Sequence, residues 1–137
     1  RGTWLATRAV LPHLRASEAG RILAIESVAV REPISGLALS NAVRPGVVGW
    51  LKTLARELAR EGVAVNTIAP GRIATDRLRA LYGPAGPSPA DLALIPAARL
   101  GTTAEIGAVA CFLVSELASY VTGTVVPVDG GLSRGLL

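Results

Sequence analysis

Apolar residues follow two spacings along the chain, one typical of amphipathic helices and one typical of buried strands. Apolar side chains three or four residues apart predict three helices, over residues 2–17, 38–60 and 103–116. Short apolar runs predict three strands, over residues 21–27 and 63–69 and within 124–131. The runs at 21–27 and 63–69 favour strands buried on both faces. This alternation of helix and strand indicates an α/β fold with a parallel sheet and helices on both of its faces.

Local signals set the expected ends of these elements. Pro12 should break or kink the last turn of the first helix, and Glu61-Gly62 should end the second. Thr102 or Thr103 is suited to cap the third helix. Residues 72–98 are rich in proline, with a possible short helix near 75–83, and form a long connection. Connections of this length are usually functional, so we expect this one to shape a substrate pocket.

Polar and small residues follow the predicted strands at the edge where parallel sheets bind ligands, beyond the carboxyl ends of the strands. These ends are Glu26-Ser27, Ala69-Pro70-Gly71 and Val128-Asp129, and the helix that carries "SNAVR" (40–44) opens on the same rim. The order of the elements therefore predicts one site at this edge.

Composition excludes several classes of protein. No uninterrupted apolar run is long enough for a membrane span. The net charge is +4, but the arginines are scattered and Lys52 is the only lysine, so we expect no nucleic-acid binding. Cys111 is alone, which rules out a disulfide within the chain and makes a cytoplasmic setting the default. His13 has no cysteine or carboxylate at ligand spacing, so no metal site is expected.

Three segments resemble the C-terminal half of a short-chain dehydrogenase/reductase: "GRILAIESVA", "VAVNTIAPGRIATD" and "AARLGTTAEIGAVACFLVSELASYVTGTVVPVDGG". Each is weak alone, but the three occur in the family's order and spacing. The resemblance implies the C-terminal part of a Rossmann-like, doubly wound parallel sheet that binds NAD or NADP. It also implies a dimer or tetramer, with the helices over 2–17 and 40–60 at the dimer interface.

The glycine-rich phosphate loop of the family lies in its N-terminal half, and no G-x-G-x-x-G follows a strand here. The residue that selects NAD or NADP is likewise missing. We therefore expect residues 1–137 to form a single, partial dinucleotide-binding domain. The chain also has no methionine and begins in mid-helix, which predicts a cleaved or truncated piece.

By resemblance, Ser27 matches the family serine that hydrogen-bonds the substrate carbonyl. The family's tyrosine and lysine should follow at positions 40 and 44, where this chain has Ser40 and Arg44. Ser27, Ser40 and Arg44 are thus the candidate catalytic residues. Candidate cofactor contacts are Arg44, Pro70, Gly71, Ile73 and Thr75.

Other roles remain open for these residues. Ser40 is suited to cap the helix, Arg44 to lie solvated at the surface, and Pro45 would allow the helix to begin nearer Arg44. Glu26 either faces solvent or contacts substrate. The Pro70-Gly71 segment is either a site where backbone approaches a ligand or a plain turn, and Asp129 is expected to be structural or at an interface.

The resemblance implies an NAD(P)-dependent oxidoreductase that transfers hydride between nicotinamide and a small-molecule carbonyl or secondary alcohol. A water held by Ser40 and Arg44 could then carry the proton, since a serine hydroxyl is too short and too weak an acid to replace tyrosine. The alternative is a non-catalytic member or fragment that acts as an oligomerising subunit. Three strands alone would leave the "RILAIES" edge open, so we expect the chain not to be stable as a monomer.

Overall fold

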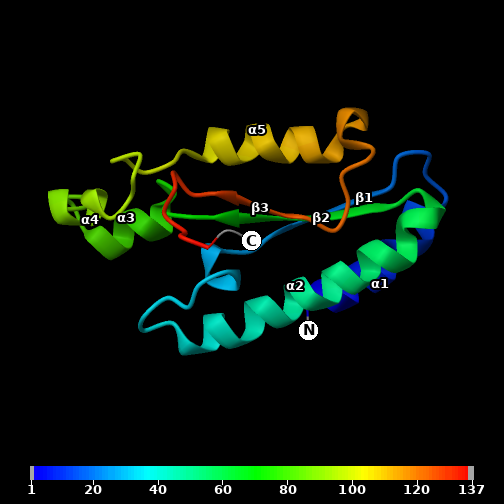
Figure 1. Ribbon diagram of the computed structural model, residues 1–137, viewed down its shortest axis with the longest axis horizontal. Helices are drawn as coiled ribbons and strands as arrows, with labels where there is room; N and C mark the ends of the chain where they lie inside the picture. Colours follow the sequence, from blue (N-terminus) through cyan, green and yellow to red (C-terminus); the bar gives the residue numbers. More distant parts are fainter. Residues whose placement is uncertain (1, 136–137) are drawn as a thin grey trace.

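The computed structural model describes residues 2–135 as a parallel sheet between two layers of helices (Figure 1). The three strands lie in the order β1 (Arg21–Ile25), β2 (Ala64–Pro70) and β3 (Val125–Val128). One face is covered by α1 (Gly2–Arg15) and α2 (Ala38–Leu58), and the other by α5 (Thr103–Val114). The predicted α/β fold, a parallel sheet flanked by helices, is confirmed.

The central strand, β2, pairs with both neighbours in parallel register, with Arg21 opposite Ala64 and Thr67 opposite Val125. Its residues are buried up to Pro70, as its apolar run predicted. The same prediction is wrong for β1, which is partly buried and has Ile25 half exposed. Within residues 2–135, β1 pairs with β2 alone, so its outer hydrogen-bonding edge has no partner strand.

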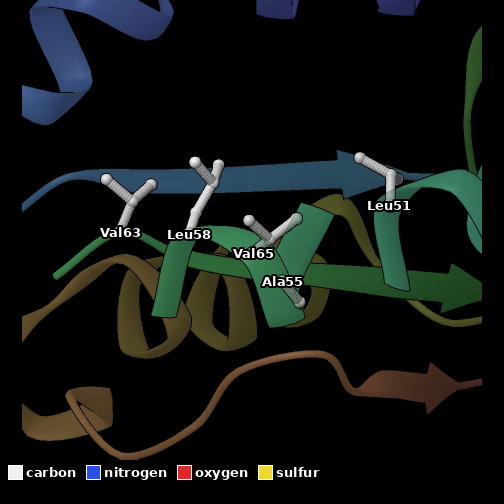
Figure 2. Packing of buried hydrophobic residues seen from close by; sticks show 5 residues of the cluster. All are labelled: Leu51, Ala55, Leu58, Val63 and Val65. Carbon is white, nitrogen blue, oxygen red and sulfur yellow. The ribbon is translucent and has the colours of Figure 1, made fainter. Parts of the chain in front are cut away.

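The main core cluster joins α2 to β2. Leu51, Ala55 and Leu58 recur every three or four residues, so one stripe of α2 faces the sheet. They pack against Val63 and Val65, and all five side chains are at most 2% exposed (Figure 2). Since this stripe is fixed on the sheet, the first turns of α2 are carried to the carboxyl edge of the strands (Figure 1).

The second helix ends as predicted. A short 3₁₀ turn, η2 (Ala59–Glu61), follows α2, and Gly62 then adopts a left-handed conformation with φ of 76°. Glycine takes this conformation without steric cost.

The predicted break at Pro12 does not occur, because α1 continues to Arg15. Proline removes one helical hydrogen bond, yet its carbonyl still accepts from the Ala16 N–H at 3.2 Å. Arg15 also pairs with Glu61, which ties the end of α1 to the end of α2.

The connection over 72–98 contains two short helices, α3 (Asp76–Tyr82) and α4 (Pro89–Ala93), which lie beyond the carboxyl ends of the strands (Figure 1). The first matches the short helix expected near 75–83. The second was not predicted, although Ser88 and Asp91 form a capping box that marks its start. Two further 3₁₀ turns are η1 (Val28–Val30) and η3 (Glu116–Ala118).

Candidate functional site

The chain segments that follow the three strands meet at one edge of the sheet, as the element order predicted. The N–H of Glu26 donates to the Ile68 carbonyl at 2.9 Å, and the N–H of Gly71 donates to the Val128 carbonyl at 3.0 Å. The ends of β1 and β2, and those of β2 and β3, are thus directly hydrogen-bonded.

Ser27 lies at the end of β1, where the chain leaves the sheet. Its Oγ accepts from the Ala29 N–H at 3.2 Å and so caps η1. Ser27 Oγ donates to no acceptor among residues 2–135, so its hydroxyl proton is available to a ligand. It lines a cavity of about 250 Å³ together with segments 28–34, 71–72 and 132–133.

Ser40 and Arg44 lie one turn apart near the start of α2 and are hydrogen-bonded to each other. The Nε of Arg44 donates to Ser40 Oγ at 3.1 Å. Its Nη1 donates to both the backbone carbonyl of Glu26, at 3.0 Å, and the Glu26 Oε2, at 2.9 Å. Arg44 therefore bridges the start of α2 and the end of β1, next to Ser27.

The hypothesis that Ser40 caps the helix is wrong. The helix begins at Ala38 with Leu37 at the cap position, and the Asn41 N–H donates to the Leu37 carbonyl at 2.9 Å. The suggestion that Pro45 moves the start toward Arg44 is also wrong, since Pro45 lies inside the helix. The core contacts of the later turns hold the helix together around this residue.

Glu26, for which two environments were open, forms the buried half of an ion pair. Its side chain is 9% exposed, whereas that of Arg44 is 33% exposed. Burying a carboxylate is costly unless a cation compensates its charge. Arg44 is thus held in place by a charged partner, and its Nη2 forms no hydrogen bond among the described residues.

Asn41, the second residue of "SNAVR", was missed by the sequence analysis. Its Nδ2 donates to the Ile34 carbonyl at 2.9 Å, and its Oδ1 accepts from the Ile34 N–H at 3.0 Å. This two-point contact fixes the loop between η1 and α2, which forms a wall of the Ser27 cavity. Asparagine is a poor helix former, and its presence in the first turn was the available signal.

The candidate cofactor segment follows β2. A Cβ added to Gly71 would lie 2.6 Å from the Asp129 Cβ. The backbone of Gly71 is therefore packed closely against the turn that follows β3. Ile73 is buried and forms a parallel bridge with Gly101. Within the described residues the Ile73 N–H donates to no backbone acceptor. Thr75 caps α3 by accepting from the Leu78 N–H.

Asp129 organises the turn after β3, consistent with its expected structural role. Its carboxylate accepts from the backbone N–H groups of Gly131 and Ser133, both at 2.9 Å, and from the Ser133 hydroxyl. Burial acts to raise the pKa of Asp129, but these hydrogen bonds outweigh it and hold the pKa below its ordinary value.

Arg72, also missed, connects β2 to the two short helices. Its Nη1 donates to Tyr82 Oη at 3.1 Å and to the Asp91 carbonyl at 3.0 Å. Hydrogen bonds from Ser88, and the more distant charge of Arg72, keep the pKa of Asp91 below its ordinary value. A larger hollow of about 560 Å³ lies beside α3, lined by residues 79–87 and Leu100. It contains no candidate catalytic residue, so the Ser27 cavity is the candidate substrate site.

No group of three His, Cys, Asp or Glu side chains in residues 2–135 could hold a metal ion. No helix in this part of the chain is long and apolar enough to cross a membrane.

Comparisons with known proteins agree on one family. Residues 1–133 match the family described as enoyl-(acyl carrier protein) reductase. The chain is 44% identical over 116 residues to the 3-oxoacyl-[acyl-carrier-protein] reductase MabA of Mycobacterium bovis, covering 85% of this chain and 46% of that protein. It is 41% identical to the FabG reductase of Vibrio cholerae, covering 92% and 51%. The chain thus spans about half the length of these curated relatives.

Among solved structures, a short-chain oxidoreductase from Pseudomonas aeruginosa PAO1 superposes with a TM-score of 0.87 at 33% identity, over 94% of this chain and 52% of that one. That structure is described as NADPH-bound and as containing an atypical catalytic center.

Proposed function

The chain belongs to the short-chain dehydrogenase/reductase family, and we propose that it supplies the nicotinamide and substrate side of an NAD(P)-dependent oxidoreductase. The reaction would move a hydride between nicotinamide and a small-molecule carbonyl or secondary alcohol. One observation carries the proposal: Ser27 presents an uncommitted hydroxyl to a cavity at the carboxyl edge, one residue from the Arg44–Glu26 pair. The reductase names of the relatives and the NADPH-bound neighbour support it.

The residues after β2 fit the nicotinamide end of such a cofactor. The N–H of Ile73, which has no backbone partner among residues 2–135, is a ready donor for an amide carbonyl, and Arg44 Nη2 is a second donor for ribose hydroxyls. Thr75 accepts from Leu78 and keeps its own proton for a ligand. Pro70 pairs with Val128 and Gly71 packs on Asp129, and these contacts set the course of the segment. When bound, the nicotinamide would supply or accept the hydride.

The proton needs a separate source. Ser27 would donate a hydrogen bond to the substrate oxygen and polarise the carbonyl. Ser40 accepts from Arg44, so its proton also remains free to orient a water molecule between α2 and the substrate, and that water would pass a proton from bulk solvent to the substrate oxygen. Arg44 stays charged and stabilises negative charge on the substrate oxygen without giving up a proton. This arrangement would replace the tyrosine and lysine of the family.

The second candidate function is a non-catalytic, oligomerising subunit. Arg44 is neutralised by Glu26, and neither Tyr82 nor Tyr120 lines the Ser27 cavity, which favours a site without proton transfer. Exposed apolar side chains on the two helices of the same layer would suit a homodimer or tetramer; they are Trp4, Leu5, Val10, Leu39 and Val43. The lone Cys111 supports a reducing, cytoplasmic setting for either function.

The two functions are separated by NADPH and NADH titrations of the native protein that carries this chain, followed by turnover assays with uncharged ketones. Ser27→Ala should lower kcat/KM by about 10²–10³-fold, the usual loss when one donor to a developing oxyanion is removed. Ser119→Ala, in the exposed turn after η3, is the matched control and should leave kcat/KM unchanged. Self-association without nucleotide binding would favour the subunit instead.

A further inference from the structure

Three separate chain segments line the cavity beside Ser27. Residues 27–34 form one wall, Gly71 and Arg72 a second, and Leu132 and Ser133 a third. The segment 132–135 has no regular secondary structure, so side chains elsewhere must hold the third wall in place.

Two carboxylates hold this segment. Asp129 anchors its beginning by accepting from the Ser133 N–H at 2.9 Å. Glu32, on the first wall, anchors its end: Oε1 accepts from the Arg134 N–H and from the Gly135 N–H, the latter at 2.7 Å. These two bonds join residues that are about a hundred positions apart in the sequence. Glu32 thus contacts the part of the segment that lies beyond Ser133.

We propose that Glu32 is a specificity-determining residue, which latches residues 132–135 against the loop after η1 and so limits the size of substrate that the Ser27 cavity accepts. This inference rests on the proposed oxidoreductase function. At about 250 Å³ the cavity lies just below the roughly 300–1,000 Å³ of common ligand pockets, so it suits a compact molecule.

The lining also indicates the chemical class of the substrate. Val28, Pro33, Ile34 and Leu132 are apolar. The charged lining residues are Glu32 and Arg72, and the nearby Asp91 offsets Arg72 at 3.7 Å. The two charges of the lining therefore balance, and the lining offers no surplus positive charge to a carboxylate or phosphate group. The expected substrates are small, uncharged ketones or secondary alcohols with an apolar body.

Two substitutions at Glu32 test the latch. Glu32→Ala removes the acceptor, whereas Glu32→Gln keeps a carbonyl oxygen at the same place and serves as the matched control. Hydrogen exchange on the native protein should show faster exchange of the Arg134 and Gly135 amides in the alanine variant, by about tenfold or more, and near-normal protection in the glutamine variant. Unchanged protection in Glu32→Ala would overturn the latch, whether or not the protein is an enzyme.

Steady-state assays with NADPH test the specificity. Kinetics with a small and a bulky uncharged ketone should show Glu32→Ala raising KM for the small one with little change in kcat, and shifting the kcat/KM ratio toward the bulky one by about tenfold. Glu32→Gln should restore the wild-type ratio. Leu132→Ala, which shortens the wall but keeps the latch, should shift the ratio in the same direction with normal amide protection.

Leu132→Ala keeps the test decisive if Glu32→Ala fails to fold. An unchanged ratio in both truncation variants would refute the specificity role. A wild-type protein that binds no nucleotide and turns over no ketone would instead refute the proposed function, and the size preference would fall with it.

Discussion

At the residue scale, the electrostatics of the site depend on which member of the Arg44–Glu26 pair is buried. The carboxylate is nearly covered, while the guanidinium keeps a third of its surface in contact with solvent. Solvation can therefore compensate Arg44 if its partner is removed, but it cannot compensate Glu26. The two residues should respond unequally to substitution.

Arg44→Gln should accordingly lower the free energy of unfolding by roughly 1–3 kcal/mol, below the full cost for a deeply buried pair because the site is partly solvated. Glu26→Gln should lower the free energy of unfolding by less than half of that amount. Urea unfolding of both variants and of the double variant measures the two losses and their coupling. Equal losses, or a larger loss for Glu26→Gln, would contradict the assigned burial.

Gly71 is constrained by packing within the chain as well as by its candidate place beside a cofactor. Its absent Cβ would lie 2.6 Å from the Asp129 Cβ and 2.7 Å from the Asp129 Cα. Because backbone is involved, neither side can move alone, and Gly71→Ala should cost about 1–3 kcal/mol in unfolding free energy.

Gly107→Ala is the control for that loss. Gly107 lies in α5, and an added Cβ would have no neighbour within 4 Å, so this variant should be neutral or more stable by up to about 1 kcal/mol. Thermal melts of the two alanine variants give the comparison. Equal melting temperatures for the two variants would mean that the turn after β3 moves to accommodate the added methyl group with little loss of stability.

At the element scale, the sequence predicts the strands, the long helices and the edge where the site lies, because periodicity and element order are local signals. It does not predict that Arg44 contacts Glu26 or that Asn41 contacts Ile34. Those contacts depend on where α2 begins, and Ser40 was a plausible cap by residue type. The structure places the cap at Leu37, which has no capping side chain, because packing of the later turns on β2 decides the position of α2.

The start of α5 shows the opposite case, in which a local signal was sufficient. Thr102, one of the two predicted caps, forms a capping box with Glu105, and Arg99 pairs with the same carboxylate. The Arg99 hydrogen bond, followed by those from Thr102, lowers the pKa of Glu105 from 4.5 to about 2. A carboxyl whose pKa is depressed by folding stabilises the protein above its unfolded pKa, and this contribution is lost as the pH falls through the folded value.

Glu105→Gln should therefore reduce stability at neutral pH and flatten the loss of stability between about pH 4.5 and pH 2. Urea unfolding at several pH values measures both effects. Gly107→Ala, which changes no ionisable group of α5, is the control and should keep the shape of the wild-type pH profile. A Glu105→Gln profile parallel to that of the wild type would contradict the pKa assignment.

At the scale of the whole molecule, the sheet exposes a strand edge and the helical layer exposes apolar side chains. β1 pairs only with β2 among the described residues, and Ile25 at its end is half exposed. The unpaired edge of a strand offers backbone N–H and carbonyl groups to any other chain. A sheet of three strands buries little apolar surface at its open β1 edge. The stability of residues 1–137 should therefore depend on what covers β1.

Residues 1–137 prepared alone should therefore self-associate rather than melt as a monomer. Ile25→Lys should reduce this association by placing a charge on the open edge, an arrangement that natural sheets use against edge pairing. Leu117→Lys, at a more exposed apolar residue outside any strand, is the control and should have a smaller effect. Sedimentation velocity over a concentration series measures the association. A dilute monomer with a reversible, two-state melt would refute the prediction, because β1 would then be stable with its outer edge in water.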